Sequence, residues 1–345
     1  MGKLKAAVIG LTVGEMHIID YIANPDIEEI VICDINEEKL EKVGNSFNIN
    51  KRYTDYNKMF QEEKPDIVSV CVSNFLHKQV CIDAFKAGAH VLCEKPLART
   101  AQECEEIKNA AEQYNKKLMI NFNRRYNPES VALKKAIDEG KLGEIYYATT
   151  CWKRTRGVPW WYPLNDTKEK CGGGAFVDLG VHMLDLCMWL CGYPKPDKLM
   201  GKIYQKVSQQ EAKKRGFENF DAEDMGVAMI FMENGMTMET EISWASNREE
   251  EEECVEVRLY GTKGGALLRG TCSECHTALL IDDQDGVLVS HDIQSSKQTE
   301  NVRDAFVNAV INQTEVPCSS DEAIIISKII DGVYLSSKQS KAIDL

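Results

Sequence analysis

The sequence predicts an α/β protein with two domains, an N-terminal doubly wound parallel sheet and a C-terminal α+β domain with a large, open, mostly antiparallel sheet. Its length of 345 residues fits two domains of ordinary size. As far as Phe122, short apolar runs alternate with amphipathic stretches, which is the rhythm of βαβ units. After Pro128, longer segments alternate apolar and polar residues, as half-buried antiparallel strands do. We therefore expect domains at residues 1–122 and 123–345.

The individual elements follow from these patterns. Five apolar runs in the first domain should form buried parallel strands, with helices between them on both faces of the sheet. These runs cover residues 6–9, 29–33, 67–72, 90–93 and 118–122. In the second domain, apolar and polar residues alternate with period two over residues 225–231, 236–244 and 255–259. Helices are expected over residues 129–139, 302–312 and 321–336.

Composition and charge exclude several classes of function. The chain is 43% hydrophobic and 28% charged, which is ordinary for a protein that folds in water. No apolar run approaches the roughly 18 residues of a membrane span, and the first residues enter an apolar strand without the longer apolar region of a signal peptide. A net charge of -13 repels phosphate backbones. We therefore expect a cytoplasmic protein that binds a small molecule, with neither nucleic acid nor membrane as its partner.

The 13 cysteines are scattered and odd in number, so most are expected to be reduced thiols. Residues 272–276 spell the C-x-x-C-H pattern of haem attachment. That segment has no second C-x-x-C partner for zinc and lies among alternating strands, so we expect no metal there.

The first expected strand ends in a turn where a dinucleotide-binding fold carries G-x-G-x-x-G. Gly10 can form the tight turn and Gly14 can allow close helix packing, but Thr12 stands where a glycine would let the backbone approach a pyrophosphate. An ordinary strand-to-helix turn would look the same. Asp34 follows the second strand, where a carboxylate accepts both ribose hydroxyls of an adenosine and repels a 2′-phosphate. Asp34 therefore favours NAD(H) over NADP(H), unless it only caps the following helix.

Several further segments are more specific. They read S-N-F-L-H over residues 73–77, E-K-P over 94–96, N-R-R-Y-N-P over 123–128, G-G-G-A-F-V-D-L-G-V-H over 172–182, W-A-S-N over 244–247 and G-T-K-G-G over 261–265. In this order the chain resembles the Gfo/Idh/MocA family of nicotinamide-dependent oxidoreductases along essentially its whole length. The resemblance implies a Rossmann fold for the first domain and a homodimer or homotetramer formed through the C-terminal sheet. It also implies cofactor contacts from Gly10, Thr12, Val13, Asp34, Ser73, Asn74, His77, Glu94 and Lys95.

Oxidation of a secondary alcohol needs a base for the hydroxyl proton and a cation near the developing alkoxide. Lys95 follows a buried strand and precedes Pro96, whose ring fixes its own φ, so the lysine ammonium can serve as that cation. The plainer alternative is a surface ion pair between Lys95 and Glu94.

Asp178 and His182 are four residues apart on one expected helix and should share a face, with Asp185 one turn further along. By the resemblance, His182 exchanges the hydroxyl proton as general base or acid, while Asp178 bonds a neighbouring hydroxyl or tunes His182. Asp185 is expected to support the site or to lie on the helix surface.

The resemblance also places Arg124, Arg125, Trp160 and Tyr162 near the substrate, where aromatic faces suit a sugar ring. We therefore expect an NAD(H)-dependent oxidoreductase that acts on a secondary alcohol or ketone of a sugar, sugar derivative or cyclitol. Two alternatives stay open. One is a glycoside hydrolase that uses NAD for transient oxidation, and the other is a dinucleotide-binding sensor or co-repressor without catalysis.

Overall fold

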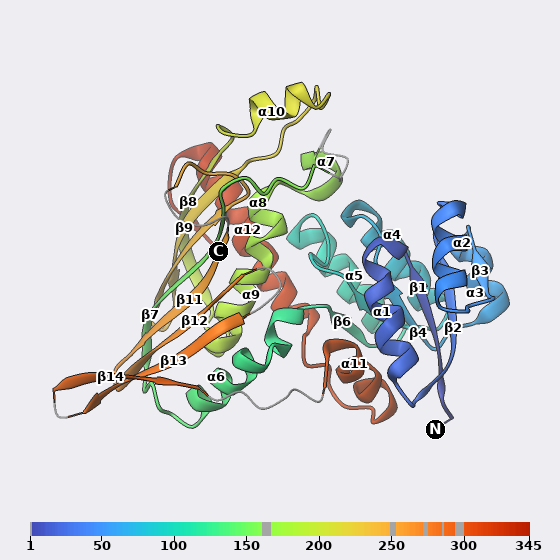
Figure 1. Ribbon diagram of the computed structural model, residues 1–345, viewed down its shortest axis with the longest axis horizontal. Coiled ribbons are helices and arrows are strands. Elements are labelled where there is room, and N and C mark those ends of the chain that lie inside the picture. The colour runs from blue at the N-terminus through green and yellow to red at the C-terminus, as the bar shows by residue number, and fades with distance from the viewer. Residues whose placement is uncertain (1, 161–166, 249–252, 272–274, 285, 294–299) are drawn as a thin grey trace. The chain divides into compact units, whose positions relative to one another are not determined.

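The computed structural model describes residues 2–160, 167–248, 253–271, 275–284, 286–293 and 300–345. The chain forms two compact units, each with its own sheet (Figure 1). The first unit consists of Met1–Phe122 and Glu300–Ile324, and the second consists of Asn123–Thr299 and Ile325–Leu345.

The first unit contains a six-stranded parallel sheet with the order β3-β2-β1-β4-β5-β6. The chain starts at the centre, winds outward to one edge and then returns to build the other half, so the predicted doubly wound sheet is confirmed. The strands are β1 (Leu4–Ile9), β2 (Ile27–Cys33), β3 (Arg52–Tyr53), β4 (Ile67–Val70), β5 (His90–Cys93) and β6 (Leu118–Ile120). The helices between them are α1 (Leu11–Ala23), α2 (Glu37–Ser46), α3 (Tyr56–Glu63), α4 (Asn74–Lys86) and α5 (Ala101–Gln113).

Burial explains why these short runs form strands. Every residue of β4 is buried, and β1 has no exposed residue, as expected for strands that are covered on both faces. Helices α2, α3 and α5 begin at residues whose side chains accept a free backbone N–H. The Asn36 side chain accepts from the Lys39 N–H at the start of α2, and the Thr100 side chain accepts from the Glu103 N–H at the start of α5.

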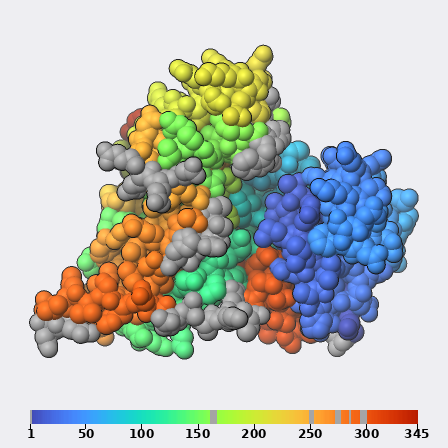
Figure 2. Space-filling view, in the orientation of Figure 1, coloured from blue at the N-terminus to red at the C-terminus, as the bar shows by residue number. Residues whose placement is uncertain are grey.

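A segment late in the chain belongs to the first unit. Helix α11 (Val302–Ile311) packs against α1 and β5, and Figure 2 shows it in red-orange beside the blue surface of that unit. The sequence-based division at residue 122 put this segment in the second domain. The difference arises because the apolar face of α11, with Phe306 and Val307 fully buried, does not itself say which sheet it covers.

The second unit contains a nine-stranded sheet with the order β14-β13-β12-β11-β7-β10-β9-β8-β15. Among the described strands of this sheet, only the β7–β10 pair is parallel, so the predicted mostly antiparallel sheet is confirmed. The strands are β7 (Ile145–Arg154), β8 (Pro196–Tyr204), β9 (Met225–Met232), β10 (Thr237–Ser243), β11 (Glu253–Gly261), β12 (Gly264–Gly270), β13 (Cys275–Gln284), β14 (Val287–Asp292) and β15 (Ile343–Asp344).

One face of this sheet carries helices. Helices α6, α8 and α9 contact its strands, and Met238 and Ile242 of β10 point to that face and are fully buried. The helical elements are η1 (Asn123–Tyr126), α6 (Pro128–Asp138), α7 (Thr167–Cys171), α8 (Ala175–Asp178), α9 (Gly180–Leu190), α10 (Gln209–Lys214) and α12 (Ser320–Gln339). Among the described residues no single helix is long and apolar enough to cross a membrane, although Thr167–Asp178 and Gly180–Leu190, bent by 50°, reach that length and composition together.

Candidate active site

The turn after β1 is shaped by two glycines. Gly10 has a φ of +90°, and a Cβ there would lie 2.5 Å from the Cys71 carbonyl oxygen, so only glycine fits. A Cβ on Gly14 would lie 2.7 Å from Val8 Cγ1, so Gly14 lets α1 pack closely on β1. The roles expected for both glycines therefore have a steric cause. Thr12 and Val13 are exposed in the first turn of α1.

Asp34 lies at the carboxyl end of β2, beside that turn. Its Oδ2 accepts the Leu11 N–H at 2.8 Å, at the start of α1, and its Oδ1 accepts the Asn36 N–H at 2.9 Å. Asn36 itself is the residue that caps α2, so the capping role considered for Asp34 falls to its neighbour. A carboxylate offers about four acceptor positions. Both oxygens of Asp34 therefore keep capacity for hydroxyl donors.

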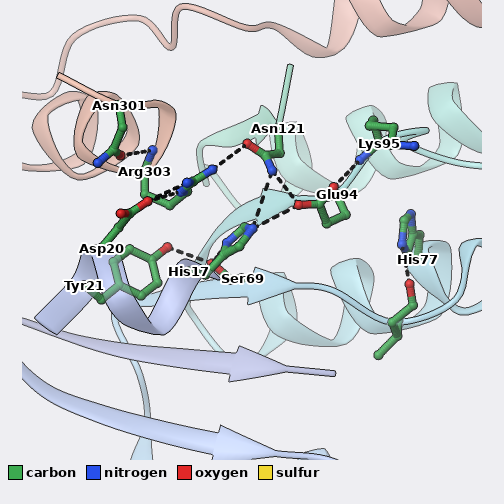
Figure 3. Close-up of polar contacts among 11 residues, drawn as sticks. His17, Asp20, Tyr21, Ser69, His77, Glu94, Lys95, Asn121, Asn301 and Arg303 are labelled. Atoms are coloured by element: carbon green, nitrogen blue, oxygen red, sulfur yellow. Dashed lines mark hydrogen bonds and ion pairs between the residues drawn. The ribbon is translucent and has the colours of Figure 1, made fainter. Parts of the chain in front are cut away.

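Glu94 and Lys95 follow β5. Lys95 is half-buried, whereas Glu94 is 8% exposed and its Oε1 accepts from His17 Nε2 at 3.0 Å and from the Asn121 side-chain amide (Figure 3). Burial raises the pKa of Glu94, but the hydrogen bonds and charges of His17, Asn121 and Lys95 outweigh it and hold the pKa below its ordinary value. Glu94 is therefore a charged group of the interior, and not the exposed partner that a surface ion pair requires.

The loop between β4 and α4 contributes Ser73, Asn74 and His77. Ser73 precedes α4 and Asn74 begins it, so both lie beside backbone N–H groups that favour an anion. His77 is fully buried, and its ring nitrogens lie 2.9 Å from the carbonyl oxygens of Pro96 and Val72. Burial lowers the pKa of His77, so the neutral ring has a single N–H and donates to one of these two carbonyls. This internal position differs from the cofactor contact that the sequence predicts for His77.

Among the described residues, His17, Cys71 and Glu94 bring three possible metal ligands within 4.8 Å of one another. His17 Nε2 and Glu94 Oε1 are bonded to each other, and burial keeps the pKa of the Cys71 thiol well above its ordinary value. A thiolate ligand is thus disfavoured. We interpret the cluster as a hydrogen-bonded group.

Asp178 and His182 lie in the second unit on two helices. The structure breaks the expected single helix at Leu179, so Asp178 ends α8 and His182 lies near the start of α9. Each side chain contacts a tryptophan of the sheet. Trp244 Nε1 donates to Asp178 Oδ2 at 3.0 Å, and the His182 ring lies 5.6 Å from the Trp152 ring. Trp152 belongs to β7, and Trp244 follows the last residue of β10, the strand that pairs with β7.

Two of the glycines before α8, Gly173 and Gly174, pack against the buried Glu223 and its partner Tyr334. Glu223 is 2% exposed and accepts the N–H groups of Gly174 and Phe176 at 2.8–2.9 Å and the Tyr334 hydroxyl at 2.6 Å. A Cβ on Gly173 would lie 2.0 Å from the Tyr334 oxygen, and one on Gly174 would lie 2.3 Å from the Glu223 carbonyl oxygen. This packing fixes the start of α8 and hence the position of Asp178.

The predicted substrate residues divide among different surroundings. The Arg124 guanidinium lies over the Trp152 ring at 4.5 Å, which brings it next to the ring that His182 contacts. Arg125 is 3% exposed and bonds both oxygens of the buried Asp185, at 3.0 Å and 2.6 Å. We therefore assign Arg125 and Asp185 to an internal ion pair, which corrects the substrate contact expected for Arg125 and the surface position considered for Asp185.

Trp160 packs among side chains near α10. Its ring stacks on Phe217 at 5.9 Å and lies under the Arg215 guanidinium at 5.0 Å. Trp160 and Phe217 are half-buried and Arg215 is exposed, so the substrate contact expected for Trp160 stays a prediction. Tyr162 lies outside the described residues.

Sequence reasoning missed the residues that support the site. His17 is one, although it lies on the buried stripe of α1, three residues after Gly14, where a polar side chain is unusual. No local sequence pattern marks Trp152, Glu223 and Tyr334 as site residues, because their partners lie far away in the sequence.

Comparisons with known proteins agree with this geometry. Residues 4–122 match the family model described as "Oxidoreductase family, NAD-binding Rossmann fold", and residues 130–267 match "GFO/IDH/MocA C-terminal domain". The chain is 28% identical over 351 residues to D-glucoside 3-dehydrogenase of Escherichia coli, covering 99% of this chain and 97% of the relative. It is 33% identical over 146 residues to inositol 2-dehydrogenase of Salmonella typhimurium, covering 41% of this chain and 43% of the relative.

Solved structures share the fold. Levoglucosan dehydrogenase in complex with NADH superposes with a TM-score of 0.85 at 20% identity, with 99% of each chain covered. Aldose-aldose oxidoreductase from Caulobacter crescentus, complexed with glycerol, gives a TM-score of 0.84 at 22% identity, covering 99% of this chain and 100% of that chain.

Proposed function

Because the chain belongs to the GFO/IDH/MocA family of oxidoreductases, we propose that it is an NAD(H)-dependent dehydrogenase acting on a secondary alcohol or ketone of a sugar, sugar derivative or cyclitol. One observation carries the proposal. Both halves of the chain match the family, and each keeps the groups the reaction needs, Lys95 after β5 and Asp178 with His182 around Leu179. Relatives named for a glucoside and for inositol support the substrate class.

Nicotinamide, when bound, accepts or supplies the hydride. The chain's own residues handle the oxygen and its proton. The Lys95 ammonium stabilises the negative charge that develops on the reacting oxygen. His182 takes or returns the hydroxyl proton, and its ring is oriented by the Trp152 face. Asp178, fixed by the Trp244 N–H, is placed to accept from a neighbouring hydroxyl.

Cofactor preference follows from Asp34. Its carboxylate lies beside the N-terminus of α1, where it accepts ribose hydroxyls and repels a 2′-phosphate. We therefore propose that NAD(H) is preferred over NADP(H).

We also propose a homodimer or homotetramer formed through the outer face of the nine-stranded sheet. That face exposes large apolar side chains on neighbouring strands, as sites of association do. Met200 is 55% exposed, Met229 38%, Phe231 40% and Tyr260 39%. A single monomeric species in light scattering at micromolar concentration would contradict this assembly.

The test of function is NADH absorbance during incubation with NAD and a panel of glycosides, aldoses, polyols and cyclitols, and with NADH and the matching keto sugars. We expect net redox turnover with at least one member. Release of a free sugar without accumulation of NADH would instead indicate the hydrolase, and binding without turnover across the panel would indicate the sensor.

A further inference from the structure

The Glu94 side chain holds the backbone of Lys95. Its Oε2 accepts the Lys95 backbone N–H at 3.2 Å, while its Oε1 lies 3.0 Å from His17 Nε2 (Figure 3). Because the pKa of Glu94 is held below its ordinary value, this carboxylate only accepts hydrogen bonds. The hydrogen between the two side chains therefore belongs to His17 Nε2.

A second buried histidine lies beside the residue that follows Lys95. The His77 ring lies 2.9 Å from the Pro96 carbonyl oxygen through Nδ1 and 2.9 Å from the Val72 carbonyl oxygen through Nε2. Burial lowers the pKa of His77, so the neutral ring has a single N–H and donates to one of these two carbonyls. His17 and His77 are both 0% exposed, so water cannot replace the contacts that either ring makes.

His17 is itself fixed by its second ring nitrogen. Nδ1 lies 2.9 Å from the Ser69 hydroxyl, which lies 2.7 Å from the Tyr21 hydroxyl. Ser69 belongs to β4 and is fully buried. The imidazole therefore spans from β4 to the end of β5.

The network also reaches α11. Arg303 donates to Asn121 Oδ1 at 3.4 Å and to Asp20 Oδ2 at 2.6 Å, and Asn121 donates to the same Glu94 oxygen as His17. Glu94 is thus tied to α1, β4, β6 and α11 of the first unit. The segment that returns to this unit late in the chain helps to hold it.

We propose that His17 is a positioning residue that fixes Lys95 at the end of β5 through the Glu94 carboxylate. This inference rests on the proposed function, in which the Lys95 ammonium stabilises the reacting oxygen. In this role His17 acts through Glu94 and does not touch the reacting atoms. Displacing a catalytic group by about 1 Å can cost on the order of a hundredfold in rate, so loss of this contact lowers kcat.

The experiment compares His17→Leu, which removes the N–H donor, with His17→Gln, whose amide can restore it. The control is His90→Leu at the opposite end of β5, where the ring only accepts the Lys117 N–H at 2.8 Å. Each purified protein is assayed for kcat, KM and NAD affinity, and hydrogen exchange of the peptide containing the Lys95 amide is followed by mass spectrometry.

We expect His17→Leu to lose between about tenfold and a hundredfold in kcat, with NAD affinity little changed and faster exchange at Lys95. His17→Gln should recover most of both properties, and His90→Leu should leave both as in the wild type. Wild-type exchange at Lys95 in His17→Leu would overturn the proposal, as would equal losses in the Leu and Gln variants.

The exchange measurement separates this proposal from the proposed function. If the wild type turned over no substrate while His17→Leu still exposed the Lys95 amide, the function would fail and the positioning role would stand. If His17→Leu does not fold, Asn121→Leu is used instead, because it removes the second donor to the same Glu94 oxygen. Its kcat and its hydrogen exchange at the Lys95 amide then test the proposal.

Discussion

Two buried glutamates support two groups of candidate site residues, and their pKa values are shifted in opposite directions. Glu94 is 8% exposed and bonds the Lys95 N–H, and Glu223 is 2% exposed and bonds the N–H groups that start the helix of Asp178. Burial raises the pKa of both carboxyls. For Glu94 the bonds and charges of its partners, His17 first, reverse that effect and lower the pKa, whereas for Glu223 the neutral donors do not, and the pKa is raised.

The comparison shows that the hydrogen-bond partners, more than the depth of burial, decide in which direction the pKa of a buried carboxyl is shifted. The Lys95 segment is held by a charged network, in which removing one member leaves another charge without compensation. The Asp178 segment is held by amide and phenol donors, which a neutral side chain can also satisfy.

Replacing each glutamate by glutamine should give the largest difference. In Glu94→Gln, one carboxylate oxygen is replaced by an NH₂ group, while hydrogen-bond donors face both positions. The NH₂ group therefore faces another donor, and we expect a loss of about 3 kcal/mol in the free energy of unfolding. At Glu223 the donors converge on Oε1, with Oε2 sharing only the Gly174 N–H. Glu223→Gln should therefore change stability by about 1 kcal/mol or less. Urea unfolding of both variants checks this, and equal losses would break the comparison.

The pH dependence of stability should have opposite signs at the two sites. Glu94, with its pKa lowered from 4.5, contributes fully above that value, and the contribution is lost as the pH falls through the lowered pKa of the folded state. Glu223, with its pKa raised from 4.5, contributes fully below that value, and the contribution is lost as the pH rises through the raised pKa. Unfolding free energies measured across pH should therefore rise for Glu223→Gln relative to wild type as the solution becomes less acidic. A difference that is constant with pH would argue against a raised pKa.

A variant of Asp34 tests the cofactor preference separately from the residues around Asp178. Under the proposed cofactor preference, Asp34→Ala removes a carboxylate that repels a 2′-phosphate, so we expect the preference for NADH over NADPH to fall by about tenfold. Calorimetric titration with both cofactors measures it. Tighter binding of NADPH than NADH by the wild type would contradict the assignment.

A hydrogen-bond partner also shifts the pKa of a cysteine thiol, and we expect a smaller effect there. Cys151 and Cys254 lie on neighbouring strands and share a hydrogen bond, which lowers the pKa of Cys254 to about 6 and raises that of Cys151. Iodoacetamide near neutral pH should therefore modify Cys254 before the buried Cys93, whose pKa is raised by burial. Peptide mass spectrometry after a short exposure gives the order, and earlier labelling of Cys93 would contradict it.

Much of the fold could be predicted from the sequence, because apolar runs and period-two alternation are local properties. The position of Lys95 at a strand end followed from a tripeptide. The pairing of His17 with Glu94 could not be predicted, since the two residues are 77 positions apart and meet only through the tertiary fold. The ion pair of Arg125 with Asp185, 60 positions apart, escaped prediction for the same reason.

The helix break at Leu179 was missed for a different reason. A four-residue spacing is compatible with one continuous helix, and the bend depends on how α8 packs against Glu223 and the sheet. Helical periodicity therefore did not predict that Asp178 and His182 lie on two separate helices.

The central claim is that Lys95 and His182 act on one oxygen, and the kcat of Lys95→Ala, His182→Ala and the double variant tests it most directly. Each single variant should lose on the order of a hundredfold or more while still binding NAD, since acid–base groups are typically worth 10²–10⁴. The double variant should lose much less than the product of the two, because removing either residue disables the same transition state. Near wild-type turnover in His182→Ala, or losses that multiply, would contradict the account.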